Sequence, residues 1–135
     1  GLTDLGVRSV TVVARDEGRA RATFDCLGDD IDFRWVPFDA PGLGQMCAEA
    51  DALVSTVPAV AAAPYADALA RAPYILDAIY DPWPTPLASA AEARGTVVIS
   101  GVHMLLNQAF GQVEQFTGRP APREAMARAV GLDYA

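Results

Sequence analysis

Two arginines stand where a predicted strand ends and a predicted helix begins. Arg15 follows the β-branched run of residues 7–14, and Arg19 comes four residues later. In a nucleotide-binding βαβ unit, the end of the second strand meets the adenosine ribose, where an arginine accommodates a 2′-phosphate. The spacing would place both guanidiniums on one helical face, where they could hold one phosphate. The alternative is a pair of solvated helix arginines balanced by Asp16 and Glu17.

Small polar residues follow two later predicted strands. Ser55 and Thr56 could donate hydrogen bonds to a pyrophosphate, although capping the helix that Pro58 opens is the simpler interpretation. Gly101 would let the backbone approach a ligand closely or adopt a left-handed conformation. These loops are therefore candidates for a binding site, each with a purely structural alternative.

The helix expected after Gly101 carries two polar side chains that could do chemistry. His103 is the only histidine, and a general-base role competes with the more common structural or solvated role. Gln108 lies in an otherwise apolar stripe, so we expect it to be buried. A buried amide needs either backbone partners or a polar ligand.

The stretch AIYDPWPTPL, residues 78–87, is unusual for a loop that only reverses the chain. A tyrosine, Tyr80, stands near its start, and three prolines stiffen it. Thr85 is placed to cap the helix that Pro86 opens. We therefore expect this loop to hold Tyr80 at the end of a strand.

Short β-branched runs alternate with helical patterns along the chain. Strands are expected at residues 7–14, 32–38, 51–57, 73–80 and 96–100, and helices at 15–28, 41–50, 58–72, 85–95, 103–118 and 122–131. The third of these helices is expected to break at Pro64. The alternation predicts an α/β fold with a parallel sheet and helices on both faces, and functional loops at the carboxyl ends of its strands.

The composition sets limits on the class of protein. The chain has 135 residues, 52% of them hydrophobic and 20% charged, which predicts one globular domain with a single core. A formal net charge of −7 argues against a nucleic-acid or anionic membrane surface. No apolar run reaches the ~20 residues of a membrane span, and no signal peptide is recognisable, so the cytoplasm is expected. Cys26 and Cys47 are expected to be free thiols, and no metal site is expected.

Two segments together resemble the shikimate dehydrogenase family. LDAIYDPWPTPLASAAEARG (residues 76–95) and SGVHMLLNQAFGQVEQFTG (residues 100–118) follow the family patterns D-x-x-Y-x-P-x-x-T-P-L, A-x-x-x-G and G-x-x-M-L-x-x-Q-A with the same order and spacing, and the second segment ends in the Thr-Gly that closes the family's F-x-x-x-T-G. The matching positions are Asp77, Tyr80, Pro82, Thr85, Pro86, Leu87, Ala91, Gly95, Gly101, Met104, Leu105, Gln108, Ala109, Thr117 and Gly118. Upstream, VTVVARDEGRA and LVSTVP are similar to two further family segments.

The resemblance implies a fold and an activity. The fold would be Rossmann-like, and the enzyme would reversibly reduce 3-dehydroshikimate to shikimate with NADPH, in chorismate and aromatic amino acid biosynthesis. By the same resemblance, the cofactor would be bound by Arg15 and Arg19 at its 2′-phosphate and by Thr56, Ala78, Gly101 and Met104. Tyr80 and Gln108 would contact the substrate, shikimate or 3-dehydroshikimate.

The chain also departs from the family pattern. Ala14 replaces an asparagine and Asp16 a threonine, and Asp16 would suit an NAD-dependent quinate/shikimate dehydrogenase. A non-catalytic dinucleotide-binding paralogue is a further alternative. The family's catalytic Lys-Asp pair and its glycine-rich loop have no counterpart here. Residues 1–135 are therefore expected to be an N-terminally incomplete, C-terminal NADP-binding domain without catalytic residues, inactive alone.

The resemblance also makes a prediction about the sheet. In the strand order 3-2-1-4-5-6, the family's first strand is central, and it has no counterpart here. Two strand edges would then lack a partner, which is costly. We expect either a longer parent protein or a gap closed by pairing residues 10–14 with residues 53–56 or with another chain, as in a homodimer or swapped assembly.

Overall fold

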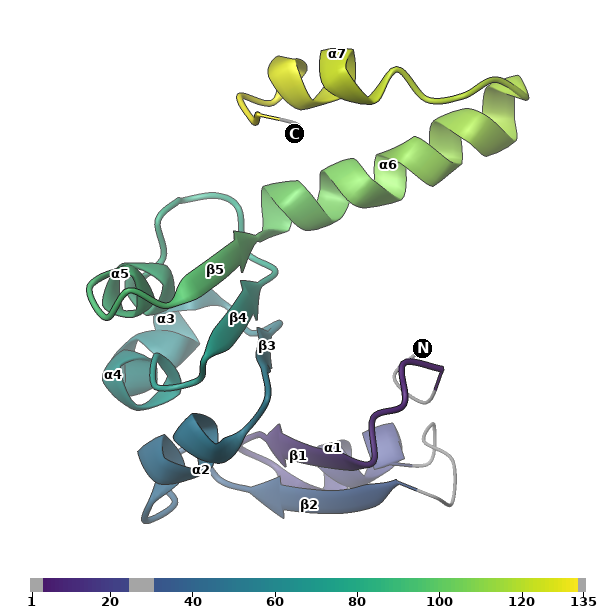
Figure 1. Cartoon of the computed structure of the whole chain (residues 1–135). Coiled ribbons are helices and arrows are strands. Elements are labelled where there is room, and N and C mark those ends of the chain that lie inside the picture. Colours follow the sequence, from purple (N-terminus) through teal and green to yellow (C-terminus); the bar gives the residue numbers. More distant parts are fainter. Residues whose placement is uncertain (1–3, 25–30, 134–135) are drawn as a thin grey trace. The chain divides into compact units, whose positions relative to one another are not determined.

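The computed structural model describes residues 4–24 and 31–133 (Figure 1). Its contacts divide the chain into two compact units, Gly1–Leu43 and Gly44–Ala135. The single core expected from the length is thus divided between two units, and each is described by itself. Cys26, and the helix end expected at Gly28, lie outside the described residues.

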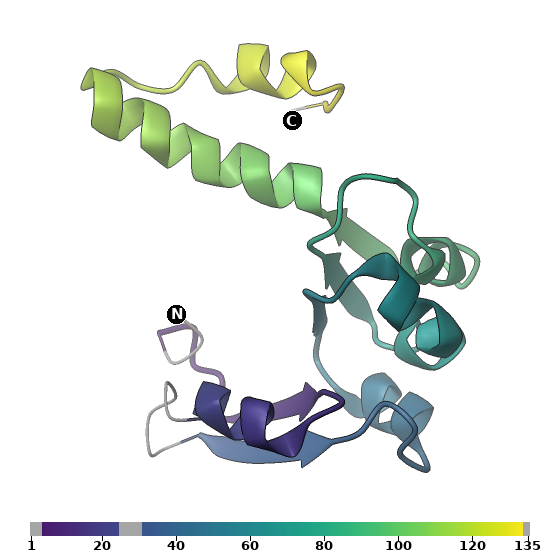
Figure 2. The same ribbon diagram turned by 180° about the vertical axis from the view of Figure 1, so that it is seen from behind.

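The first unit is a two-stranded parallel sheet with one helix. β1 (Ser9–Val13) pairs with β2 (Asp32–Val36) in register along their whole lengths. α1 (Glu17–Phe24) packs against one face of these strands (Figure 2). The ring of Phe24 lies 5.0 Å from that of Phe33, centroid to centroid, which fixes the end of α1 on β2.

The remaining elements follow in order. They are α2 (Leu43–Glu49), β3 (Leu53–Ser55), α3 (Ala59–Ala62), a 3₁₀ turn (Ala63–Tyr65), α4 (Ala66–Leu69), β4 (Tyr74–Asp77), α5 (Pro86–Glu92), β5 (Val97–Ser100), α6 (Gly101–Thr117) and α7 (Arg123–Ala129). The break expected at Pro64 is confirmed, because a 3₁₀ turn separates α3 from α4 there. Gly95 and Gly118, two predicted helix ends, have positive φ angles of 75° and 65°.

The second unit is built on a three-stranded parallel sheet in the order β3-β4-β5. α3, α4 and α5 lie together on one face of it (Figures 1 and 2). Ile75 on the sheet and Leu87 on α5 are almost completely buried there. On the strands, the exposed large apolar side chains are Val54, Tyr74, Val97 and Ile99. The parallel α/β architecture predicted from the sequence is confirmed.

The strands of the described residues form two separate sheets, one in each unit. Within the described residues, β1 pairs only with β2, and β3 pairs only with β4. The alternative in which residues 10–14 pair with residues 53–56 is therefore wrong for this part of the chain, because each strand finds its partner within its own unit. One edge of β1 and one edge of β3 have no strand partner among the described residues.

α6 and α7 share a small core of their own. Leu106, Phe110 and Ala127 are buried between the helices, with Met126 and Leu132 packed against them. The guanidinium carbon of Arg123 lies 5.0 Å from the centre of the Phe110 ring. A cation over an aromatic face is favourable, so this contact helps to hold α7 on α6. No helix in the described residues is long and apolar enough to cross a membrane.

Cys47 on α2 is a buried free thiol. Burial raises its pKa, and the positive charge of Arg71 opposes this only in part. At pH 7 the folded protein therefore holds less thiolate than an unfolded chain. We expect iodoacetamide to alkylate Cys47 more slowly in buffer than in urea, with a rate that still rises above the ordinary thiol pKa. Peptide mass mapping separates this residue from Cys26, and equal rates at pH 7 would contradict the prediction.

Candidate functional site

Three buried polar side chains form one row at the carboxyl ends of the second unit's strands. Ser55 on β3 lies opposite Asp77 on β4, and Asp77 lies opposite Ser100 on β5. All three are buried, and Asp77 is only 2% exposed. Ligands of open α/β sheets bind beyond these strand ends. The row therefore lies at the strand ends from which three segments leave, the loops after β3 and β4 and helix α6, and these segments carry six of the eight predicted site residues.

Asp77 is the centre of a small hydrogen-bond network. The Thr85 hydroxyl donates to Asp77 Oδ2 at 2.6 Å, and the Ile79 amide donates to Asp77 Oδ1 at 3.3 Å. Thr85 Oγ1 also accepts from the Ala88 amide at 3.0 Å, which confirms Thr85 as the cap of α5. The described residues contain no buried side-chain nitrogen or oxygen without a hydrogen-bond partner.

The predicted strand at residues 73–80 ends at Asp77 because of this network. The Ala78 amide still donates to the Ser55 carbonyl at 2.9 Å, but the next amide turns to the Asp77 side chain. The Gly101 amide then donates to the Ile79 carbonyl at 3.3 Å. Residues 78–80 are thereby held as a loop at the edge where we expect the site.

Gly101 lies directly against this loop. A Cβ atom at residue 101 would stand 2.2 Å from the Ala78 carbonyl oxygen, well inside contact distance. The structure thus brings together Ala78 and Gly101, both predicted at the cofactor. A glycine is required here because the backbone of Ala78, rather than a ligand, approaches residue 101 closely. The role of Gly101 in binding a cofactor stays a prediction.

The two residues predicted to contact the substrate are both exposed. Tyr80 is 53% exposed and lies in the loop that contains the cis peptide bonds Asp81–Pro82 and Trp83–Pro84. Gln108 lies on α6, on the exposed side of a helix whose buried side chains are Leu106 and Phe110. The expectation that Gln108 is buried is wrong, because the helix turns this position away from the α7 contact. Its amide is therefore accessible to a ligand.

Three further candidate residues lie beyond the strand ends: Thr56 after β3, and His103 and Met104 near the start of α6. Thr56 is exposed just beyond β3, and Met104 is half-buried in the first turns of α6. The Ser100 hydroxyl lies 2.9 Å from His103 Nδ1, and His103 is exposed. This bond joins the polar row to the first turn of α6, a link that the sequence analysis missed.

Arg15 and Arg19 belong to the first unit. α1 begins at Glu17, so Arg15 precedes the helix, and the argument that places both arginines on one helical face is wrong. The reason is Asp16, whose carboxylate caps the helix by accepting from the Arg19 amide at 2.7 Å. The described residues include no ion pair to either guanidinium.

The acids near these arginines are engaged elsewhere. Glu17 pairs with Arg21 at 2.9 Å, and Asp16 bonds the Arg19 backbone rather than its side chain. The alternative of arginines balanced by these two acids is therefore not what the structure shows. Arg15 and Arg19 are both exposed, so they remain able to bind an anion.

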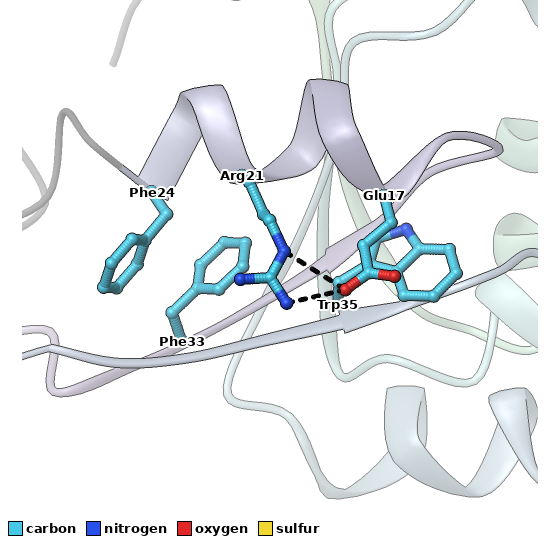
Figure 3. Close-up of a pocket in the computed structure, with 5 residues that line it drawn as sticks. All are labelled: Glu17, Arg21, Phe24, Phe33 and Trp35. Atoms are coloured by element: carbon cyan, nitrogen blue, oxygen red, sulfur yellow. Dashed lines mark hydrogen bonds and ion pairs between the residues drawn. The ribbon is translucent and has the colours of Figure 1, made fainter.

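Figure 3 shows a surface hollow of about 280 Å³ between α1 and β2, with the Glu17–Arg21 pair among aromatic rings. Its lining consists of Glu17, Arg21, Phe24, Phe33 and Trp35. Trp35 Nε1 donates to the Ala14 carbonyl at 3.0 Å, so the indole nitrogen is already satisfied. A second hollow lies at Gly118 and Arg119. Neither hollow is lined by a predicted site residue, and the described residues contain no cluster of three metal-ligating side chains.

Comparisons with known proteins agree with the residue patterns. The sequence profile of the family described as "Shikimate 5'-dehydrogenase C-terminal domain" matches residues 101–130. The solved shikimate dehydrogenase of Mycobacterium tuberculosis is 56% identical, with a TM-score of 0.87, over 96% of this chain and 49% of that one. A shikimate dehydrogenase (NADP(+)) of Haloarcula marismortui is 35% identical over 93% of this chain and 47% of its own length.

A third similar protein is named for a different activity. Quinate dehydrogenase from Corynebacterium glutamicum, solved in complex with NAD, is 26% identical with a TM-score of 0.75, over 93% of this chain and 46% of that one. The chain therefore spans about half the length of each of these three proteins. The matches confirm the resemblance seen in the sequence: the chain is similar to the C-terminal portion of shikimate dehydrogenases.

Proposed function

We propose that this chain is the cofactor-binding portion of an NADP-dependent shikimate dehydrogenase, which interconverts 3-dehydroshikimate and shikimate. The observation that carries the proposal is the 56% identity to the Mycobacterium tuberculosis enzyme over 96% of the chain. By the same proposal, the enzyme acts in the cytoplasm, in chorismate and aromatic amino acid biosynthesis. We also propose that the protein forms a homodimer or a swapped assembly in which a second chain pairs with the free edge of β1 or β3.

The proposal gives each unit a role. The residues of the first unit fit a 2′-phosphorylated dinucleotide, because Arg15 and Arg19 are exposed and lack an ionic partner within the described residues. Guanidinium groups bind phosphate through charge-assisted hydrogen bonds. In the second unit, Thr56, Ala78, Gly101 and Met104 would line the cofactor, and Tyr80 and Gln108 would hold the substrate.

The bound cofactor would supply or accept the hydride. This chain's residues would orient the reacting partners: the backbone of Ala78 and Gly101 on one side, and Tyr80 and Gln108 on the other. None of them is proposed as the proton donor. We propose residues 1–135 as a C-terminal dinucleotide-binding domain, and turnover as a property of a protein that also carries the family's catalytic Lys-Asp pair.

The coenzyme preference tests this proposal. We expect Arg15→Ala and Arg19→Ala each to raise the KM for NADP about 10- to 100-fold, because a charged hydrogen bond is worth roughly 1.5–3 kcal/mol. The KM for NAD should stay unchanged, because NAD lacks the 2′-phosphate. The measurement is steady-state oxidation of shikimate by a full-length protein that carries these residues together with the catalytic Lys-Asp pair, with each coenzyme varied in turn.

Arg21→Ala is the matched control. Arg21 is also an exposed arginine of the same unit, but it is paired with Glu17. It should leave both KM values unchanged. A protein that oxidises shikimate with NADP yet is unaffected by both Arg15→Ala and Arg19→Ala would contradict the phosphate assignment, and a protein with no NADP-linked shikimate oxidation would contradict the proposed activity.

The second candidate is an NAD-dependent quinate/shikimate dehydrogenase. It is favoured by Asp16, an acid at the end of β1, and by the likeness to the NAD-bound quinate dehydrogenase. Against it, Asp16 already serves as the cap of α1. The same assay decides: a lower KM for NAD than for NADP, with quinate oxidised, would replace the first candidate by the second.

A further inference from the structure

We propose that Asp77 is a positioning residue, which fixes Ala78 and Tyr80 for the reaction by tying both ends of the 78–85 loop to the sheet. The proposal rests on the proposed function. Asp77 is 2% exposed, and both of its carboxylate oxygens accept hydrogen bonds from the protein. It therefore has no free face toward a substrate and acts through the loop that it holds.

The two bonds of Asp77 reach opposite ends of the loop. Oδ1 accepts from the Ile79 amide at 3.3 Å, immediately before Tyr80. Oδ2 accepts from the Thr85 hydroxyl at 2.6 Å, where α5 begins. One side chain thus closes the loop across eight positions of sequence, and its own strand anchors it in the middle of the sheet.

The other anchors of residues 78–80 are made by backbone atoms. The Ala78 amide bonds the Ser55 carbonyl, and the Ile79 carbonyl accepts from the Gly101 amide. Asp77 is the side chain that bonds the backbone of residues 78–80 in the described part of the chain. A change in this side chain can therefore shift the loop while the ladder of the sheet persists.

Asparagine is the sharpest replacement. It has the shape of aspartate but offers one acceptor and one donor, whereas Ile79 and Thr85 both present donors to Asp77. The amide oxygen can accept only one of these two bonds, and at the other end the side-chain NH₂ can bond Thr85 only if the hydroxyl turns from donor to acceptor. The charge-assisted bond at that end is lost, so the tie there is weaker. Because a displacement of about 1 Å can cost about 100-fold in rate, we expect Asp77→Asn to lower kcat/KM for shikimate about 10- to 100-fold.

Two further readouts separate positioning from simple loss of fold. The affinity for adenosine 2′,5′-bisphosphate, which is the phosphorylated adenosine part of the cofactor, should stay at the wild-type value in Asp77→Asn. Leu69→Ala, a buried change on α4 remote in sequence from the loop, should destabilise the same unit and keep kcat/KM when the protein is folded. Thr85→Ser should also keep kcat/KM, because it retains the hydroxyl.

The anchor itself is tested by hydrogen exchange, which needs no activity. The Ile79 amide should exchange at least about 10-fold faster in Asp77→Ala, which removes both acceptors, than in the wild-type protein, while the amides of the β4–β5 ladder keep their rates. Unchanged exchange together with unchanged kcat/KM would overturn the proposal, and so would an equal loss of kcat/KM in Leu69→Ala. A full-length wild-type protein, with the catalytic Lys-Asp pair, that exchanges as expected but does not oxidise shikimate would contradict the proposed function and leave the anchor established.

Discussion

Gly101→Ala is expected to destabilise the second unit by about 3 kcal/mol or more. The added Cβ would lie 2.2 Å from the Ala78 carbonyl oxygen and 2.7 Å from its carbonyl carbon. Both are backbone atoms, so no rotamer change can relieve the overlap. Either the loop after β4 or the start of α6 must move, and the hydrogen bond from Gly101 to Ile79 is lost with that movement. Urea unfolding followed by circular dichroism measures the change.

Gly111→Ala provides the control for this prediction. Gly111 lies within α6 as well, but a Cβ there would meet no atom within 4 Å. Alanine is a better helix former than glycine by about 1 kcal/mol, so this variant should be slightly more stable than the wild-type protein. Two alanine variants of equal stability would show that the contact with Ala78 does not constrain the fold.

Thr85→Val is expected to cost about 2–4 kcal/mol, although valine has nearly the same shape. The hydroxyl caps α5 through the Ala88 amide, and the loss of such a cap costs about 1 kcal/mol. It also donates to Asp77, and a buried acceptor left without its partner costs about 1–3 kcal/mol more. The free energy of unfolding from urea titration tests the sum.

Thr85→Ser isolates the hydroxyl from the methyl group. Serine keeps both hydrogen bonds and loses one buried methyl, so its cost should be about 1 kcal/mol. The difference between the valine and serine variants therefore measures the two hydrogen bonds. If valine proves no more costly than serine, the network around Asp77 contributes little to stability.

Local sequence signals predicted much of the fold. The cap at Thr85, the proline at the first position of α5 and the break at Pro64 depend on neighbouring residues alone, and the structure confirms them. The ends of β4 and α1 were harder to predict. β4 stops at Asp77 because the Asp77 carboxylate accepts from the Ile79 amide, and α1 starts at Glu17 because Asp16 caps it.

At the candidate site too, local sequence patterns identified the residues but not the contacts between segments that are distant in sequence. The family patterns pointed to Ala78 and Gly101, which are brought together in the structure, but not to the backbone contact between them. Gln108 is exposed although most residues around it in the sequence are apolar, because only one side of α6 meets α7. The role of Asp77 could have been suspected from an acid at a strand end with a capping threonine eight residues later.

This polypeptide is expected to be prone to aggregation. Its sheets have unpaired strand edges, and four large apolar side chains on the strands are exposed: Val54, Tyr74, Val97 and Ile99. Apolar side chains on strands beside unpaired backbone donors and acceptors make a template on which other chains can add. The net charge of −7 opposes such aggregation at neutral pH, and added salt or a pH near the isoelectric point of about 4.4 removes that repulsion. Low ionic strength and a pH well above the isoelectric point are therefore the conditions under which the polypeptide stays dispersed.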